Sequence, residues 1–302
     1  MEARPKRLIP IVAASVAGLL FLSGCGGRST KSASQSTKAN GEIVFQSNRS
    51  GDDDIYVMDA DGTRQRRLTS SPGDDCCRAV WSPDGSKIAF ASERDGNSEI
   101  YVMNADGSGQ QRLTRTPATD FFSSWSPDGR TIAFSRGRKL NFNLYLMSAD
   151  GSHQRNVVAH AVYPAWSPNG QQIAFVRILA GRTSISVVNA DGSQEHRLTR
   201  GLDTAPSWAP DGAKIAFQRQ VAGLGAIYVM NADGSGQRRL SKGDSDDGTP
   251  SWSSDGRLIV FGRLTGRNEH IYVMNVDGSG VRPLTHAGDT GSLPAWQPVA
   301  RR

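Results

Sequence analysis

Residues 81–114 read WSPDGSKIAFASERDGNSEIYVMNADGSGQQRLT, and this stretch decides the fold. The segment Trp81–Gly85 ends one short strand in a turn, because proline at the second turn position and glycine at the fourth suit a type I turn with a bulge. Residues 87–92 and 99–103 predict two further strands around a polar loop, and the second of these is apolar on both faces. Residues 111–114 predict a short outer strand, and no segment has a convincing helical period. We therefore expect a four-stranded antiparallel sheet.

The same unit recurs six times along the chain. Every Trp falls in register, at Trp81, Trp125, Trp166, Trp208, Trp252 and Trp296. One Phe per unit follows the same period, at Phe45, Phe90, Phe134, Phe175, Phe217 and Phe261. An Asp-Gly pair recurs at Asp61, Asp106, Asp150, Asp191, Asp233 and Asp277. Three independent markers with one period, 41 to 44 residues between successive Trp, establish an internal repeat.

Sheets with two apolar faces cannot stand alone, and radial stacking of such sheets makes a β-propeller. With the strands of each unit called A to D, the repeats begin at residues 41–45 with a B strand. They end at residues 293–296 with an A strand that has no B strand after it. We predict an all-β, six-bladed β-propeller over residues 41–302, in which the C-terminal strand joins the first blade and leaves no exposed edge.

The composition excludes several other classes. The chain has 302 residues, of which 37% are hydrophobic, so it can bury a core and is not a disordered polymer. Its net charge of +6 falls to +4 without residues 1–24, which carry three basic side chains and one acidic one. Such a mild excess permits contact with anionic surfaces but does not require nucleic acid. Three Cys exclude a disulfide scaffold and a multi-Cys metal fold.

Residues 1–25 predict a lipoprotein signal peptide. A basic start is followed by an apolar run at residues 8–22, which is short for a spanning helix of about 20 residues. Leu22-Ser23-Gly24-Cys25 closes the run and resembles the bacterial lipobox, which implies that Cys25 is acylated and anchors the mature chain. An ordinary secretory signal with a chance Cys is the alternative. Residues 26–40 predict a flexible linker, because they contain no apolar residue larger than Ala. We expect a lipid-anchored protein of the bacterial envelope, on the outer side of the cytoplasmic membrane, in the periplasm or at the outer membrane.

The repeated signatures resemble those of a known family. Trp-Ser-Pro-Asp-Gly, Ile-Ala-Phe, Ile-Tyr-Val-Met-Asn-Ala-Asp-Gly and Arg-Leu-Thr are similar to the WD40-like repeats of the TolB β-propeller family, over residues 41–302. The resemblance implies a propeller that works through protein contacts in the envelope. TolB also has an α/β domain before its propeller, where this chain has only a linker, so its role in the Tol-Pal system does not carry over. Related propellers cap serine peptidases, but this sequence has no Gly-x-Ser-x-Gly elbow.

One face of the ring is expected to do the binding. The A–B turns and the C–D turns hardly differ between copies and lie on one face. The B–C and D–A loops lie on the other face and differ from copy to copy, as in residues 138–141 and 220–223. Variation on a fixed scaffold indicates the specialised face, so we assign binding to the B–C and D–A loops.

Charged residues repeat on the predicted binding face. Asp120, Asp203 and Asp247 each stand five residues before a Trp, at the start of the strand that lines the channel, and Asp75 and Asp289 lie nearby with shifted spacing. Four arginines each stand two residues after the repeated Phe and therefore point to the same side of the sheet: Arg136, Arg177, Arg219 and Arg263. Two hypotheses follow. Either these groups form structural ion pairs, or they form a binding site at the channel mouth for a cation or a basic segment.

Signals for metal or nucleophile chemistry are weak. Residues 52–61 are rich in Asp and permit a calcium loop, but six near-copies of the Asp-Gly motif favour turn chemistry. Only two of the five His, His160 and His286, fall in D–A loops. Adjacent Cys76 and Cys77 form either a vicinal disulfide or two thiols that pack as small apolar residues. We predict no metal and no cofactor, although a cation bound in the channel is an open alternative.

The sequence therefore predicts a non-enzymatic, lipid-anchored propeller. It is expected to be a monomer that binds an envelope protein or a cell-wall ligand, contacts the membrane through its anchor and does not bind nucleic acid. The alternative is an envelope enzyme, a polysaccharide lyase or hydrolase, with its site at the channel mouth. A cluster of His or paired carboxylates at the channel would favour the enzyme, and the sequence offers scattered Asp instead.

Overall fold

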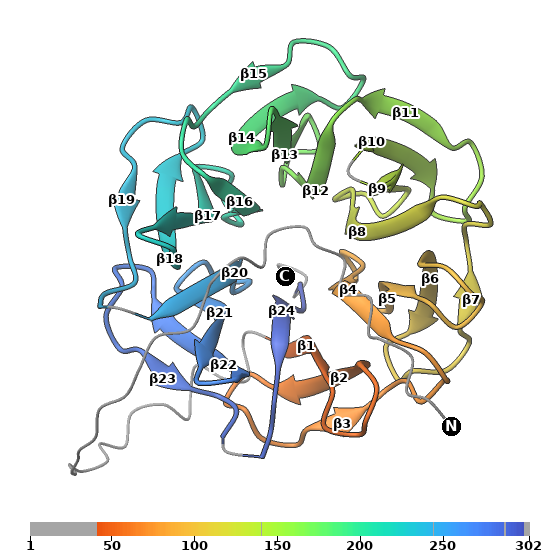
Figure 1. The fold of residues 1–302 in the computed structure, drawn as a ribbon, viewed down its shortest axis with the longest axis horizontal. Coiled ribbons are helices and arrows are strands. Elements are labelled where there is room, and N and C mark those ends of the chain that lie inside the picture. Colours follow the sequence, from red (N-terminus) through yellow and green to blue (C-terminus); the bar gives the residue numbers. More distant parts are fainter. Residues whose placement is uncertain (1–40, 140, 244, 287, 299–302) are drawn as a thin grey trace.

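The computed structural model describes residues 41–139, 141–243, 245–286 and 288–298. These residues form 24 strands in six antiparallel sheets of four, arranged around a central axis as a closed ring (Figure 1). The predicted fold class is confirmed. The signal peptide, Cys25 and the linker predicted for residues 1–40 lie outside the described residues. Among the residues described, there is no helix of the length and apolar character needed to cross a membrane.

Each sheet is one blade, with its A strand innermost and its D strand at the rim. Blade 1 contains β24 (Ser292–Trp296), β1 (Glu42–Ser47), β2 (Asp54–Asp59) and β3 (Arg66–Arg67). Blade 2 contains β4 (Asp75–Trp81), β5 (Lys87–Ser92), β6 (Glu99–Asn104) and β7 (Gln111–Arg112). Blade 3 contains β8 (Thr119–Trp125), β9 (Thr131–Arg138), β10 (Asn141–Ser148) and β11 (Arg155–Val158).

The second half of the ring repeats this order. Blade 4 contains β12 (Ala161–Trp166), β13 (Gln172–Leu179), β14 (Arg182–Asn189) and β15 (His196–Arg197). Blade 5 contains β16 (Asp203–Trp208), β17 (Lys214–Val221), β18 (Leu224–Asn231) and β19 (Arg238–Arg239). Blade 6 contains β20 (Asp246–Trp252), β21 (Leu258–Thr265), β22 (Asn268–Asn275) and β23 (Arg282–Pro283).

The C-terminal strand closes the ring as predicted. β24 pairs with β1, so that Ile43 faces Trp296 and Val44 faces Ala295. All four of these side chains are buried. The first blade therefore takes its inner strand from the far end of the chain, and β1 has a hydrogen-bonded strand on both of its edges.

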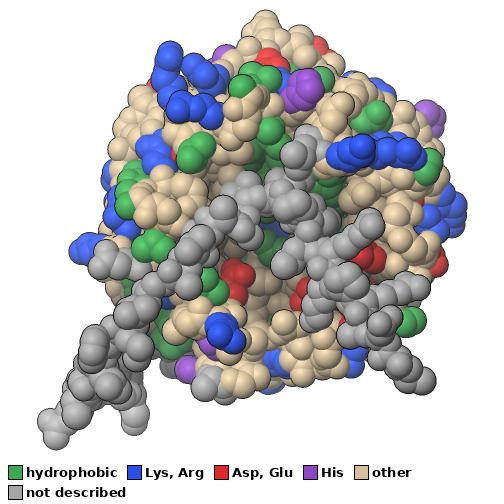
Figure 2. All heavy atoms as spheres, in the orientation of Figure 1, with side chains coloured by type: hydrophobic (Ala, Val, Ile, Leu, Met, Phe, Trp, Pro, Cys, Tyr) green, Lys and Arg blue, Asp and Glu red, His purple; other side chains and the backbone are tan. Residues whose placement is uncertain are grey.

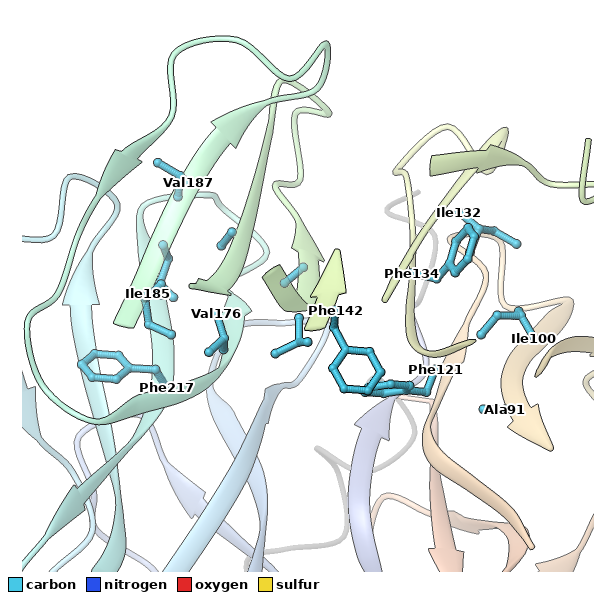
Figure 3. Packing of buried hydrophobic residues seen from close by; sticks show 14 of the residues in the cluster. Ala91, Ile100, Phe121, Ile132, Phe134, Phe142, Val176, Ile185, Val187 and Phe217 are labelled. Atoms are coloured by element: carbon cyan, nitrogen blue, oxygen red, sulfur yellow. The ribbon is translucent and has the colours of Figure 1, made fainter. Parts of the chain in front are cut away.

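The core lies between the blades. One cluster joins Phe45 and Met58 of blade 1 to Ile271 and Leu284 of blade 6. The largest cluster runs through blades 2 to 5, where Phe121, Phe134 and Phe217 are at most 1% exposed (Figure 3). Both faces of each sheet are thus covered by its neighbours, which explains why the strands read as apolar on both faces.

The repeated Asp-Gly pair serves contact between blades. Gly62 in the C–D turn of blade 1 has a φ of +90°, which only glycine adopts readily. A Cβ at this position would lie 2.4 Å from the carbonyl oxygen of Leu284 in blade 6. Gly107, Gly151 and Gly278 approach a leucine of the preceding blade in the same way. Glycine is required at these positions both by the turn and by the close approach of the preceding blade.

Each inner strand carries a bulge. The A–B pairing shifts register just before every repeated Trp. The residue three positions before each Trp has a positive φ, between 51° and 66°. These six positions, one per blade on the strand nearest the axis, are called the channel ring: Arg78, Phe122, Tyr163, Ala205, Thr249 and Leu293.

Candidate functional site

The two faces of the ring differ as predicted. On one face the A–B and C–D turns bond to each other, as in the Ala105 amide that donates to the carbonyl of Ser86 at 2.9 Å. The Asx turn chemistry is visible at Asp61, whose Oδ1 accepts from the amide of Thr63 at 3.0 Å and from its hydroxyl at 2.6 Å. These hydrogen bonds lower the pKa of Asp61. Asp59, in the same turn, pairs with Arg64 at 2.5 Å, so both carboxylates have turn partners.

Clefts on this turn face recur with the repeat. One cleft of about 520 Å³ lies between blades 2 and 3 and is lined by Lys87, Trp125 and Asp128. A smaller one of about 200 Å³ lies between blades 5 and 6, with Lys214, Trp252 and Asp255 in corresponding places. Because the same elements build both clefts, they are a product of blade stacking rather than a specialised feature.

The predicted Asp and Arg residues are paired inside single blades. Asp120 on β8 lies opposite Arg136 on β9, whose Nε and Nη2 donate to its two oxygens at 2.8 and 2.7 Å. Blades 5 and 6 repeat this two-point pairing with Asp203–Arg219 and Asp247–Arg263. All three carboxylates are completely buried, and the arginine side chains are 14–20% exposed.

Each arginine also lies over the repeated aromatic rings. The Cζ atom of Arg136 is 5.0 Å from the centroid of Phe134 and 4.9 Å from that of Tyr145. Arg219 and Arg263 contact the corresponding Phe and Tyr in their blades. This position confirms that the arginines point to the Phe side of strand B. The guanidinium is thus held by a carboxylate on strand A and by rings on strands B and C.

The pKa values of the paired Asp and Arg residues are affected both by burial and by the pairing itself. Burial raises the pKa of Asp120, while the hydrogen bonds and the charge of Arg136 act in the opposite direction. Hydrogen bonding to Asp203 raises the pKa of Arg219 against the opposing effect of burial. A carboxylate that has lost its water depends on its arginine, and the arginine depends on the carboxylate.

In blade 4 a different residue supplies the carboxylate that pairs with the arginine of strand B. Ala161 stands opposite Arg177, where the other blades place an Asp. Arg177 instead pairs with Glu195, at the position where other blades use Gln154 or Gln237 to accept a hydrogen bond from the arginine. The carboxylate thus comes from the residue just before strand D instead of from strand A, and the arginine keeps a partner. Sequence reasoning missed Glu195, although the replacement of Gln by Glu in the blade that lacks Asp is a readable signal.

Two further pairs were missed because the hairpin is shorter. β1 and β5 have six residues, whereas the other B strands have eight. The arginine therefore falls four residues after the repeated Phe, as Arg49 and Arg94. Arg94 bonds both oxygens of Asp75, at 2.9 and 3.0 Å, and Arg49 bonds Asp289 at 3.0 Å.

The geometry favours structural ion pairs over a charged channel mouth. The Asp residues are distributed one per blade, each pointing to its own arginine, and are not brought together. In the described parts of the chain, no group of three or more His, Cys, Asp or Glu is placed so that it could hold a metal ion. Cys76 and Cys77 are both unbridged, and hydrogen bonding to Cys77 together with burial raises the pKa of the Cys76 thiol.

The loop face carries exposed apolar side chains instead. Three of the four most exposed large hydrophobic residues lie in its loops: Leu179 and Leu264 in B–C hairpins and Leu202 in a D–A loop, at 57%, 43% and 48% exposure. They belong to blades 4 to 6. Val281, at 40%, follows a C–D turn and belongs to the turn side.

Basic side chains flank these leucines. Arg182, Arg200 and Arg267 occur two or three residues from a leucine and are exposed. None of the three has an ion pair or side-chain hydrogen bond with the described residues. Figure 2 shows one face of the ring, where Lys and Arg side chains gather around the periphery with single hydrophobic side chains between them. We call the three leucines and three arginines of blades 4 to 6 the loop-face patch.

A buried carboxylate lies on the same hairpin as Leu264 of this patch. Glu269 pairs in register with Leu264 on the hairpin of blade 6. Burial raises its pKa to about 7, with a further contribution from the charge of Asp246. No ion pair or hydrogen bond to this carboxylate is formed by the described residues. Near neutral pH it is therefore partly protonated.

A closed ring of six four-stranded blades, each with an ion pair at its inner hairpin, defines a six-bladed β-propeller. The sequence matches the family model of the TolB beta propeller domain over residues 36–199 and 153–302, and the chain belongs to that family. No curated protein sequence matches the chain.

Solved structures share the fold at low sequence identity. TolB from Acinetobacter baumannii is 21% identical, with a TM-score of 0.77 over 86% of this chain and 67% of that one. A chain of a nidogen/laminin complex is 12% identical, with a TM-score of 0.70 over 85% of this chain and 98% of that one. An oligogalacturonate lyase from Vibrio parahaemolyticus is 15% identical, with a TM-score of 0.58 over 82% of this chain and 75% of that one. At these identities the likeness shows the fold alone. Binding proteins and an enzyme both use this fold, so the fold does not determine the function.

Proposed function

We propose that this protein is a non-enzymatic scaffold of the bacterial envelope that binds a partner protein through the loop-face patch. The observation that carries the proposal is the patch itself: three leucines at 43–57% exposure beside three arginines that have no ionic partner among the residues that the structure describes. Exposed apolar side chains rimmed by polar ones are typical of protein contact sites. Membership of the TolB β-propeller family supports the same class of function.

The chemistry of the patch describes the partner. Leucines in the centre of a contact require apolar side chains opposite them, and arginines around them require carboxylates. We therefore expect a protein segment that combines aliphatic or aromatic residues with Asp or Glu. The ion-paired hairpins beneath the loops hold the patch in place, so that binding requires little ordering of the scaffold.

The patch should form adducts with a partner in intact cells. A photo-crosslinking amino acid such as p-benzoylphenylalanine at position 202 or 264 is expected to give a discrete adduct after illumination. The matched control is position 281, because Val281 has similar exposure on the opposite side of the ring. Equal adducts from position 281, or none from 202 and 264, would contradict the assignment of the face.

Charge reversal in the patch distinguishes specific binding from nonspecific hydrophobic association. Changing Arg200 and Arg267 to Glu should abolish the adduct at position 202 while leaving the melting temperature unchanged, because both side chains are exposed and form no ion pair with the described part of the chain. An adduct that survives the double change would show that carboxylates are not what the patch recognises.

We also propose that Cys25 anchors the propeller to a membrane by lipid, which places the scaffold in the envelope. The lipobox-like end of the apolar run supports this. Cys25→Ser is expected to move the protein from the membrane fraction to the soluble fraction or to leave it unprocessed, with loss of metabolic lipid label. Membrane fractionation and label that match the parent protein would exclude the anchor. The linker at 26–40, at roughly 20–25 Å, would let the loop face reach a partner beyond the headgroups.

A further inference from the structure

The inner strand of blade 2 contains one residue more than those of its neighbours. Asp75 stands six residues before Trp81, whereas the corresponding Asp of blades 3, 5 and 6 stands five residues before its Trp. In the ladder of blade 2, the three residues 77–79 lie opposite Phe90 alone. In blade 3 only the two residues 122–123 lie opposite the repeated Phe. The bulge of blade 2 is therefore enlarged, and it begins within a pair of adjacent cysteines.

The backbone of this bulge is strained at the cysteine pair. Cys77 and Arg78 have φ angles of +65° and +66°. Glycine aside, no other two successive residues in the described part of the chain both have a positive φ, and the bulges of the other five blades have one such residue each. A positive φ costs free energy in a residue that has a side chain, and strain of this kind is concentrated at functional sites. The position of the cysteines in this bulge therefore requires an explanation.

The two thiols lie at the loop-face end of the inner strand. Cys76 and Cys77 are the second and third residues of β4, directly after the D–A loop. Both are free thiols, Cys76 being 9% exposed and Cys77 half-buried. The amide of Cys77 donates to Oε1 of Gln46 in blade 1 at 3.1 Å. This hydrogen bond fixes the orientation of the peptide bond that joins the two cysteines.

Adjacent cysteines can form a disulfide only in a strained ring. Successive Cα atoms are at most about 3.8 Å apart, whereas disulfides usually join Cα atoms about 4.4–6.8 Å apart. The bond between Cys76 and Cys77 would close a small ring that includes their own peptide bond. A strained disulfide is reduced more readily than a structural one, and labile disulfides of this kind serve regulation. Such a pair is suited to changing its redox state rather than to stapling the fold.

We propose that Cys76 and Cys77 form a thiol–disulfide exchange site, which a low-molecular-weight disulfide oxidises to a vicinal disulfide and the corresponding thiol reduces again. The thiolate of Cys77 attacks one sulfur of the small disulfide, forms a mixed disulfide and releases the first small thiolate. Cys76 then loses its proton and attacks Sγ of Cys77, which expels the second small thiolate. Two protein thiols are oxidised, one disulfide is reduced to two thiols, and the protons of the cysteines pass to the released thiolates. The site goes beyond the protein contacts proposed for the loop face and does not depend on them.

The two thiols differ in the way that this order of steps requires. Cys77 is the more exposed of the two and therefore meets the small disulfide first. Hydrogen bonding to Cys77 and burial raise the pKa of the Cys76 thiol, and the charges of Glu93 and Asp53 act in the same direction. Cys76 thus stays protonated while Cys77 reacts. Closure of the ring must also turn the peptide whose amide bonds Gln46, so the disulfide and this hydrogen bond compete.

Mass spectrometry of the full-length protein tests the exchange. Trypsin releases residues 68–78 as one peptide, which contains Cys76 and Cys77 but not Cys25. After equilibration with oxidised glutathione, this peptide should be lighter by two hydrogen atoms and resistant to alkylation. An excess of reduced glutathione should restore two thiols that can be alkylated. A peptide that keeps both thiols in oxidised glutathione, or that carries stable glutathione adducts instead, would overturn the proposal.

Single substitutions test the order of the two steps. Cys76→Ala should retain a stable glutathione adduct on Cys77, because no second thiol is present to release it. In Cys77→Ala, the remaining thiol of Cys76 should be alkylated about tenfold more slowly than Cys77 is in Cys76→Ala, since burial limits its access to the reagent. Absence of the adduct, or equal rates of alkylation in the two variants, would contradict an exchange that begins at Cys77.

The hydrogen bond from blade 1 gives an independent readout. Gln46→Ala frees the Cys77 amide and should favour the disulfide by about two- to tenfold in the glutathione ratio at which half of the protein is oxidised, which is the effect of one hydrogen bond. The matched control is Gln218→Ala, because Gln218 also follows the repeated Phe but lies in a blade without cysteines, and its ratio should equal that of the parent. A shift in both variants, or in neither, would overturn the competition between disulfide and hydrogen bond. Adducts at position 202 in Cys76→Ala report on the loop-face patch separately.

Discussion

A chain that ends at residue 290 is expected to lose its cooperative fold, whereas a chain that ends at residue 298 is expected to melt at the parent temperature. The first truncation removes β24, which supplies the inner strand of blade 1 and is the only ladder partner of β1 on that side. It also removes Trp296, which is 5% exposed and packs in the cluster between blades 6 and 1.

The magnitude follows from the groups that are lost. Truncation of a buried Trp to Ala alone costs about 3–5 kcal/mol. The deletion adds the loss of Ala295, which is also buried, and of the hydrogen bonds that tie Gln297 to Glu42 and to Gly85. Since whole domains are stable by only about 5–15 kcal/mol, these losses take a large share of the free energy of unfolding of the ring.

Circular dichroism melts and soluble yield of the two truncated chains provide the measurement. The chain ending at 298 controls for the effect of shortening alone, because it retains β24 and Gln297. If the chain ending at 290 melted as sharply and at the same temperature as the parent, the ring would not depend on its closing strand.

Much of the fold could be predicted because each marker residue has one dominant physical role. Trp81 and Phe90 are buried at fixed places in the repeat, and Gly107 combines a positive φ with close approach to Leu68 of the preceding blade. Such requirements are local or repeat with the blade, so they leave a periodic trace in the sequence. Closure was predictable for the same reason, since a repeat that begins on strand B and ends on strand A has one way to complete its first sheet.

The site was less predictable because its properties depend on partners rather than on residue types. Asp120 and Asp61 are both carboxylates in a repeated motif, yet one is completely buried and the other is exposed in a turn. Leu202 is 48% exposed in a D–A loop, whereas Leu198, four residues earlier, is buried, so residue type alone does not identify the exposed leucine. Periodicity identifies what every blade shares, whereas binding depends on what one blade does differently.

The three Asp residues predicted from the sequence give the second large effect. Changing Asp120, Asp203 and Asp247 together to Asn is expected to lower the melting temperature strongly. Each carboxylate accepts from two nitrogens of its arginine, and an amide offers one acceptor while its NH₂ group faces a donor. A buried group left without its partner costs about 1–3 kcal/mol. The three pairs lie in separate blades, so their losses should add to roughly 3–9 kcal/mol.

A control with the same change in net charge distinguishes pairing from overall electrostatics. Asp106, Asp150 and Asp191 are exposed residues of the C–D turns, and each accepts a hydrogen bond from the amide two residues later, which Asn can also accept. Their triple change to Asn should leave the melting temperature within a few degrees of the parent. The two triple variants therefore differ only in whether an arginine loses its partner.

Blade 4 supplies the reciprocal test. Glu195→Gln should lower the stability by less than loss of a buried Asp does, because the Glu195 side chain is 36% exposed. Adding Ala161→Asp to the same chain should restore a carboxylate on strand A opposite Arg177.

If the variant with Asp120, Asp203 and Asp247 changed to Asn melted like the parent but lost the adduct at position 202, the carboxylates would belong to the binding site rather than to the scaffold. A lowered melting temperature with the adduct retained, together with rescue in blade 4, would instead show that all six blades hold an arginine with a carboxylate, which comes either from the A strand side or from the residue just before strand D.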